Sequence, residues 1–291
     1  MPHYIGIIFA FVALLGWGFG DFFIQKSTRL LGSSWKSLFI IGLIGLVVLF
    51  PFVRNDILIL NVGELVLLGV LGVVILFTAL FDFEALRRGK IAIVEPVMSI
   101  ELPLTVALSV TLANESLSWI QLVLIAVVFA GIMLAVTFTN VNKRLGKGVL
   151  ERGVIFAGIG AVGLALVSFL TGISSQRISP LMAIWFSNLV FTLICLVYIL
   201  AKGQFRGMIE GLKKHPAPIL AMSFFDNSAW VAYAFATTYI PISIAITISE
   251  GYVALAALLG IFINKEKLKR HQVIGVALTI AGVLALSYFS E

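Results

Sequence analysis

Residues 115–131 read ESLSWIQLVLIAVVFAG, and residues 266–282 read EKLKRHQVIGVALTIAG. At a constant offset of 151 residues, both stretches share the polar pattern E-x-L-x-x-x-Q and end on glycine. Apolar segments often resemble one another by chance, but a shared polar pattern is harder to obtain that way. The same register extends upstream, where Ile91 pairs with Ile242. The sequence therefore predicts two related halves.

The composition is typical of a membrane protein. Of the 291 residues, 60% are hydrophobic and only 12% are charged, which is about half the charged fraction of an ordinary soluble domain. The mean hydropathy is +1.11. A soluble protein and a disordered chain are both excluded, because neither combines so much apolar surface with so little charge. We predict an all-α polytopic membrane protein.

Ten apolar runs are long enough, at about 20 residues each, to cross the hydrocarbon core as helices. Their approximate limits are 4–24, 35–53, 63–87, 90–113, 118–138, 153–175, 181–201, 217–239, 242–263 and 271–289. The longest connections, 139–152 and 202–216, are too short for a soluble domain. The first run lacks a basic leader, so we interpret it as a retained span and not as a signal peptide.

The basic residues predict an orientation. With ten spans, 18 of the 20 Lys and Arg residues lie in connections on one side of the membrane. They are Lys26, Arg29, Lys36, Arg87, Arg88, Lys90, Lys143, Arg144, Lys147, Arg152, Lys202, Arg206, Lys213, Lys214, Lys265, Lys267, Lys269 and Arg270. Only Arg54 and Arg177 lie on the side of the termini. The positive-inside rule then places both termini outside, and the net charge of +6 needs no nucleic-acid partner.

Ten spans divide into two halves of five. Because five is odd, the second half must cross the membrane in the opposite direction. We predict two inverted five-helix repeats, at 1–140 and 152–291, joined by a basic linker at 141–151. Inverted repeats are typical of secondary transporters, because two similar halves can exchange conformations and open a central site to either side in turn.

On these residues the chain resembles the EamA-type transporters of the drug/metabolite transporter superfamily. The resemblance is carried by the two E-x-L-x-x-x-Q turns before glycine-ending helices and by Gly16-Trp17-Gly18 in the first span. It covers the whole chain. It implies secondary transport of small metabolites, often export, across a bacterial or archaeal plasma membrane. It also implies a central cavity lined mainly by the third, fourth, eighth and ninth spans. Family members usually have cytoplasmic termini, opposite to the orientation that the charge predicts.

Carboxylates inside apolar spans are costly and mark candidate functional positions. Glu101, Asp226 and Glu250 lie nearest the centres of their spans. Asp82 and Glu95 lie about one and a half turns inside theirs. We predict that these acids bind substrate or protons.

Two further acids have simpler explanations. Glu84 precedes Arg87 and Arg88 by three and four residues, so a local helix ion pair accounts for it. Asp21 lies near the expected end of the first span and can reach the interface.

Polar and aromatic side chains share helical faces with the acids. Asn227 and Trp230 lie on the face of Asp226, and Trp17 lies one turn before Asp21. An acid beside an aromatic wall suits an ammonium group, through charge and cation–π attraction. We therefore add Asn227, Trp230 and Trp17 to the predicted binding residues, with plain packing as the alternative for the aromatic rings. Ser and Thr residues on these faces are better explained by interhelical hydrogen bonds.

Enzymatic and metal motifs do not occur. The sequence holds no H-E-x-x-H, G-x-S-x-G or P-loop pattern. The single cysteine, Cys195, lies in an apolar run and predicts a small core residue. We expect no enzyme, no cofactor and no metal. The expected partners are a small-molecule substrate and the lipid bilayer, and a homodimer is left open.

Three functions compete. The first is a secondary transporter of amino acids, amines or drugs that works by alternating access, with proton coupling through a midplane carboxylate as one option. The second is a flippase for a lipid-linked sugar or phosphate, which would need a basic cavity, whereas the predicted midplane is acidic. The third is a membrane enzyme or scaffold without transport, for which motifs are missing.

Overall fold

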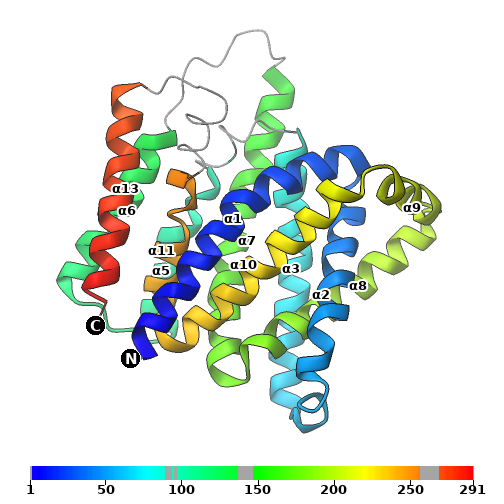
Figure 1. Ribbon diagram of the computed structural model, residues 1–291, viewed down its shortest axis with the longest axis horizontal. Coiled ribbons are helices and arrows are strands. Elements are labelled where there is room, and N and C mark those ends of the chain that lie inside the picture. Colours follow the sequence, from blue (N-terminus) through cyan, green and yellow to red (C-terminus); the bar gives the residue numbers. More distant parts are fainter. Residues whose placement is uncertain (1, 89–93, 95–96, 137–146, 256–268, 291) are drawn as a thin grey trace.

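The computed structural model describes residues 2–88, 94, 97–136, 147–255 and 269–290, and within these ranges it contains helices and no strands. In chain order the helices are α1 (Pro2–Leu31), α2 (Ser34–Val53), η1 (Ile57–Ile59), α3 (Val62–Arg88), α5 (Glu101–Leu112), α6 (Trp119–Val136), α7 (Lys147–Arg177), α8 (Pro180–Ala201), α9 (Phe205–Lys214), α10 (Pro216–Tyr239), α11 (Ile242–Ser249) and α13 (Arg270–Tyr288). The two termini lie at the same end of the bundle (Figure 1).

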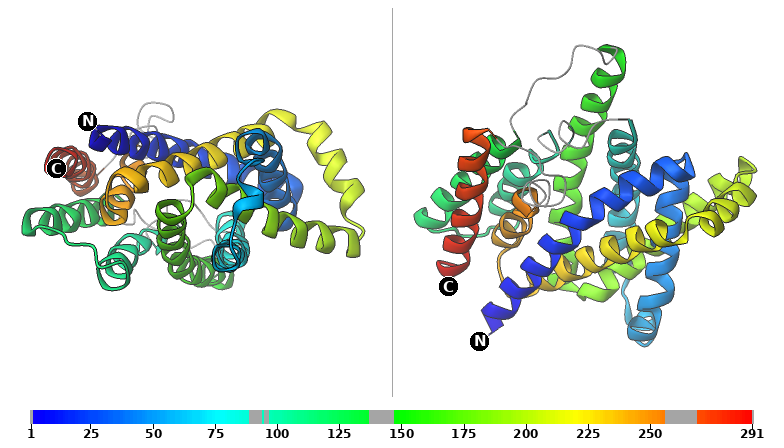
Figure 2. Two further views of the ribbon diagram at one scale, coloured as in Figure 1. Left: turned by 90° about the horizontal axis from the view of Figure 1, so that it is seen from below. Right: turned by 45° about the horizontal axis from the view of Figure 1, so that its top comes forward.

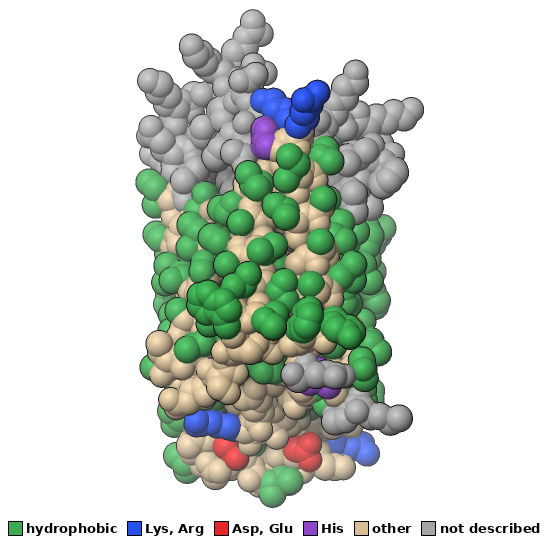
Figure 3. Space-filling model, turned by 90° about the vertical axis from the view of Figure 1, so that its left-hand side faces the viewer, with side chains coloured by type: hydrophobic (Ala, Val, Ile, Leu, Met, Phe, Trp, Pro, Cys, Tyr) green, Lys and Arg blue, Asp and Glu red, His purple; other side chains and the backbone are tan. Residues whose placement is uncertain are grey.

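The chain is a multi-pass membrane protein. Among the described helices, six are long and apolar enough to cross a membrane, namely α1, α2, α3, α7, α8 and α13. Shorter apolar helices cover residues 101–112, 119–135 and 242–255. Hydrophobic side chains cover the middle of the bundle edge, and charged side chains lie near its two ends (Figure 3). This banding is what a bilayer requires of a helical surface.

Several boundaries differ from the sequence prediction. Helix α1 continues to Leu31, seven residues beyond the expected end at position 24. The connection 202–216 contains helix α9, whose Met208 is buried against the bundle while Lys213 and Lys214 are exposed. Helix α7 begins at Lys147, so residues 147–151 of the predicted linker are helical. A ten-residue amphipathic helix escapes a search for long apolar runs, because only one of its faces is apolar.

The most extensive helix contacts join the first half of the chain to the second. Helix α1 packs along α10, α3 along α7, α2 along α8, and α6 along α13. In two views α1 and α10 run side by side across one face, and α6 and α13 form one edge of the molecule (Figures 1 and 2). Each half therefore depends on the other to bury its apolar surface.

The repeated sequence pattern has a structural role at the α6–α13 edge. Gln121 accepts a hydrogen bond from the Ser118 N–H (2.8 Å) and donates one to the Phe289 carbonyl (3.0 Å). Gln272 accepts one from the Lys269 N–H (3.0 Å) and donates one to the Ala135 carbonyl (3.3 Å). Each glutamine thus caps its own helix and binds the end of the antiparallel partner.

Glycines let the backbones of these two helices approach closely. A Cβ atom placed on Gly275 would lie 2.2 Å from the Ala135 nitrogen and 2.6 Å from the Gly131 carbonyl oxygen. A Cβ atom on Gly131 would lie 2.6 Å from the Thr279 hydroxyl. No side chain fits at either position, so glycine is required for this contact.

The helices in the regions of the fourth and ninth predicted spans are interrupted at equivalent positions. Helix α5 starts just after one interruption, at Glu101, and α11 ends at the other, before Glu250. Tight backbone hydrogen bonds from residue i to i−3 occur there from 100 to 97 (3.4 Å) and 102 to 99 (3.2 Å), and from 251 to 248 (3.1 Å) and 253 to 250 (3.3 Å). The two sets are related by the offset of the sequence repeat. At the first interruption Pro103 lacks the N–H that would bond to Ser99 in a regular helix.

Candidate functional site

A cavity lies where the two interruptions meet, and we call it the acidic cavity. Its lining comes from α1, α3, α5, α7 and α10, from Met98 just before α5, and from Glu250 and Tyr252 just after α11. The lining residues are Trp17, Asp21, Ile24, Asp82, Met98, Glu101, Leu164, Asp226, Trp230, Glu250 and Tyr252. The centres of water molecules can occupy about 60 Å³ of it, which is room for a few waters. Both halves of the chain contribute to its wall.

Five carboxyl groups line this cavity. They are Asp21, Asp82, Glu101, Asp226 and Glu250, and no Lys, Arg or His is among the described lining residues. Glu101 is only 5% exposed and Glu250 only 4%. Desolvation and mutual repulsion disfavour several negative charges in one small cavity. The arrangement therefore favours the binding of a proton or a cation.

Glu101 is held by residues from the second half. The Ser168 hydroxyl on α7 donates a hydrogen bond of 2.5 Å to the Glu101 carboxylate. The Tyr233 hydroxyl on α10 donates one of 3.2 Å to the Ser168 carbonyl. Ser168 and Tyr233 are both fully buried. The orientation of this carboxylate thus depends on helices of both halves.

An aromatic group adjoins the carboxylates. The ring of Trp17 lies 5.1 Å from Trp230, 5.6 Å from Tyr233 and 6.5 Å from Tyr252, measured between ring centroids. The contacts with Trp230 and Tyr252 are edge-on, an arrangement that aromatic pairs prefer. Aromatic faces next to carboxylates form a surface suited to an organic cation.

A second cavity adjoins the first across Asp82, Leu164, Asp226 and Trp230, which line both. Its remaining wall is mainly apolar and includes Thr78, Ser187, Asn188 and Asn227. The two cavities therefore share the carboxyl groups of Asp82 on α3 and Asp226 on α10.

Asn227 connects three helices beside this second cavity. Its amide donates hydrogen bonds to the Ile41 carbonyl (3.0 Å) and the Ser223 carbonyl (2.9 Å). Its oxygen accepts one from Asn188 (3.1 Å). A Cβ atom on Gly45 would lie 2.2 Å from both asparagine side chains. In this conformation Asn227 therefore shapes the cavity wall through bonds within the protein.

Most predicted binding residues meet at these cavities. Trp17, Asp82, Glu101, Asp226, Trp230 and Glu250 line the acidic cavity, and Asn227 lines its neighbour. Glu95 lies outside the described residues. Their roles in binding remain predictions.

Asp21 is the main residue that sequence reasoning misplaced. The first span was expected to end at position 24, which put Asp21 near the interface, but α1 continues to Leu31 and Asp21 lines the cavity. The spacing of Trp17, Asp21 and Gln25 was a usable signal. The Gln25 amide, however, donates to the Leu86 carbonyl (2.9 Å) and is not part of the cavity lining.

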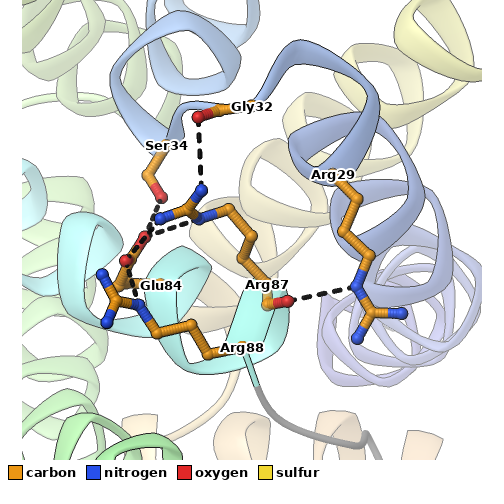
Figure 4. Close-up of polar contacts among 6 residues, drawn as sticks. All are labelled: Arg29, Gly32, Ser34, Glu84, Arg87 and Arg88. Carbon is orange, nitrogen blue, oxygen red and sulfur yellow. Dashed lines mark hydrogen bonds and ion pairs between the residues drawn. The ribbon is translucent and has the colours of Figure 1, made fainter. Parts of the chain in front are cut away.

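Two simpler interpretations are confirmed. Glu84 forms local ion pairs with Arg87 (2.7 Å) and Arg88, as shown in Figure 4. Cys195 is completely buried in the core.

Three hydroxyl groups do not form the interhelical hydrogen bonds that the sequence predicted. Ser223, Thr237 and Thr247 donate to carbonyls of their own helices, not to neighbouring helices. A carbonyl three or four residues earlier is the nearest acceptor for a serine or threonine in a helix.

Comparison with known proteins agrees with this architecture. The model of the EamA-like transporter family matches twice, over residues 4–137 and 151–288. No match was found among curated proteins. Among solved structures, 28 chains match. One of them, described only as the crystal structure of a protein, is 15% identical to this chain, with a TM-score of 0.72, 98% of this chain covered and 97% of the other. That similarity shows a shared fold. The two family matches cover nearly the whole chain, which therefore belongs to the EamA-like transporter family.

Proposed function

We propose that the protein is a secondary active transporter that moves small organic molecules by alternating access. The observation that supports this most directly is the acidic cavity, which is lined by both halves at two interrupted helices. Interrupted helices at a repeat interface are typical of transporter binding sites.

The proposed architecture has ten spans in two inverted repeats, 1–140 and 152–291, around the linker 141–151. The helix pairing supports it. In the two proposed repeats α1 corresponds to α7, α2 to α8, α3 to α10 and α6 to α13. The α1–α10 pair of one repeat order therefore becomes the α7–α3 pair of the other, and the α2–α8 and α6–α13 pairs each join two corresponding helices. Two halves related by an approximate twofold axis produce this pattern of contacts.

The proposed substrates carry an ammonium group, as amines, amino acids and cationic drugs do. The five carboxyl groups and the aromatic surface of the acidic cavity support this choice. Exchange of a bound proton for the cation would couple export to a proton gradient. A flippase for lipid-linked phosphates is less well supported, because no basic side chain is among the described lining residues.

The proposed location is the plasma membrane of a bacterium or archaeon, with both termini outside. The termini lie at one end of the bundle, as an even number of spans requires (Figure 1). Reporter fusions at each terminus test the orientation, and a cytoplasmic signal from both would show that the proposed orientation is wrong.

The transport experiment uses purified protein in proteoliposomes. A panel of amino acids, mono- and polyamines and aromatic cations is tested with and without an imposed pH gradient. We expect accumulation of at least one ammonium compound that collapses when the gradient is removed. Glu101→Gln, Asp226→Asn and Glu250→Gln should each lower it, while Glu84→Gln, an acid outside the cavities, serves as the control. Unchanged transport and pH dependence in all three cavity variants would refute the proposal.

A further inference from the structure

A second carboxylate joins the two halves far from the acidic cavity. Glu115, in the connection between α5 and α6, accepts hydrogen bonds from the Ile242 N–H (2.5 Å), the Ser243 N–H (3.0 Å) and the Ser243 hydroxyl (2.5 Å). These partners form the first turn of α11, which belongs to the other half of the chain. One side chain therefore satisfies the free donors at the N-terminus of a helix that is distant in sequence.

The local structure places Glu115 for this contact. Helix α5 ends at Leu112, and Asn114 adopts a left-handed conformation with φ of +55°. The chain turns there, and the Glu115 N–H bonds back to the Ser109 carbonyl (3.2 Å). On the other side Pro241 precedes α11 and has no N–H of its own. A negative charge is also favoured at this position by the dipole of α11.

The same two helices carry cavity acids at their opposite ends. Helix α5 begins at Glu101, and α11 ends just before Glu250. The helices pack against each other and run in opposite directions, because their outer ends meet at Glu115 and their inner ends at the cavity. By length, α5 spans about 18 Å and α11 about 12 Å. Glu115 thus sets how far α11 can slide along α5, and with it the relative position of the two cavity acids.

Helix α11 also fills the space between the cavity and the end of the bundle that holds the termini. All eight of its residues are buried. Ile244, Ala245, Ile246 and Ile248 belong to an apolar cluster shared with α1, α5 and α10. Opening the cavity toward that end requires α11 to move within this cluster, and Glu115 holds its outer turn.

We propose that Glu115 is a positioning residue for transport: its carboxylate holds α11 against α5 and stabilises the conformation in which the termini side of the acidic cavity is closed. The inference rests on the proposed function, because it needs a cavity that opens to each side in turn. Loss of the contact shifts the conformational balance toward the state open on the termini side.

The test measures access to the cavity and needs no knowledge of the substrate. Leu164→Cys, in a Cys195→Ala background, places one thiol in the lining of both cavities. A membrane-impermeant maleimide is applied to intact cells and to inside-out vesicles, and a protease-cleavable N-terminal tag identifies the termini side. The variants are Glu115→Gln and, as matched control, Glu64→Gln. Glu64 also accepts from a backbone N–H near a helix start, that of Asn61 (2.9 Å), and like Glu115 it is partly buried, but this bond lies within its own half.

We expect Glu115→Gln to raise the labelling ratio, termini side over opposite side, about five- to tenfold, and Glu64→Gln to leave it unchanged. Hydrogen exchange at the Ile242 and Ser243 amides should accelerate in the first variant only. Faster exchange with an unchanged labelling ratio would overturn the proposal, since Glu115 would then be only a helix cap.

A milder variant covers the case in which Glu115→Gln fails to fold. Ser243→Ala removes one of the three hydrogen bonds and should shift the ratio in the same direction by about twofold; no shift in folded protein overturns the proposal. The proposed function fails differently. If the thiol in the parent protein is labelled from one side only under every condition, alternating access is refuted, whereas two-sided labelling with an unchanged ratio refutes only the role of Glu115.

Discussion

Glu84 and Glu115 are both carboxylates that accept several hydrogen bonds, but they connect different parts of the molecule. Glu84 binds Arg87, Arg88 and the Ser34 hydroxyl (3.1 Å), all in the first half (Figure 4). In the same cluster Arg29 donates to the Arg87 carbonyl (3.1 Å). Glu115 instead binds the first turn of α11 in the second half.

Contacts within one half and contacts between the halves should have different effects, the first on the stability of the fold and the second on the equilibrium between conformations. Contacts within one half persist in every arrangement of the two halves, so they stabilise the folded protein as a whole. Contacts between halves stabilise only the arrangements in which they form. We therefore expect the Glu84 cluster to affect unfolding and the Glu115 contact to affect which side of the cavity is open.

We expect the largest effect on substrate uptake from a substitution at the cavity end of α11. Glu250→Gln should reduce uptake of the substrate found in the proteoliposome screen roughly 10- to 100-fold, because a buried charged partner for the substrate or proton is lost. Glu84→Gln should keep uptake within about twofold. A comparable loss in both variants would break the distinction between the two regions.

A pair of glycines sharpens the comparison. At Gly251, next to Glu250, a Cβ atom would lie 2.9 Å from the Ile248 carbonyl oxygen and 3.0 Å from Leu14. Gly32, whose carbonyl accepts from Arg87 (3.2 Å), has open space but a φ of +69°. We expect Gly251→Ala to cost about 1–3 kcal/mol and to change the labelling ratio. Gly32→Ala should cost about 1 kcal/mol and change only thermal unfolding. Equal labelling ratios in the two variants would contradict this.

The effects of replacing Glu84 and Glu115 should also differ in their dependence on salt concentration. The arginines paired with Glu84 are 30% and 38% exposed at their side chains, so we expect Glu84→Gln to cost only about 0.5–1 kcal/mol. Most of that cost should disappear at 1 M salt in thermal unfolding, because exposed ion pairs are screened. The effect of Glu115→Gln on labelling should persist, since its partners are buried. A labelling shift that vanishes with salt would argue against a contact at the buried helix end.

The smallest expected effect lies within α5, between its two functional ends. Thr105 is completely buried, and its hydroxyl has no hydrogen-bond partner among the residues that the structure describes. Thr105→Val keeps the shape and removes an unsatisfied polar group, so we expect stability against thermal unfolding to rise by no more than about 0.5 kcal/mol. A clear loss would indicate that an ordered water pairs with this hydroxyl.

Much of the fold was accessible from local sequence features. The E-x-L-x-x-x-Q pattern indicated two related stretches, and the family model matches the chain twice, over residues 4–137 and 151–288. The acids Glu101, Asp226 and Glu250 were recognisable because a carboxylate is rare in an apolar helix. Helix α9 and the full length of α1 were missed, since amphipathic or polar extensions carry little hydropathy signal.

The sequence by itself determined the membrane class, the repeat and the acids at the centres of the apolar runs, because these depend on each segment's own hydropathy and spacing. Only the tertiary structure decided that Asp21 joins those acids and that Glu115 holds α11. Both results depend on which residues of distant segments meet. Helix periodicity describes the face on which a side chain lies, but the partner opposite that face is selected by the packing of the two halves.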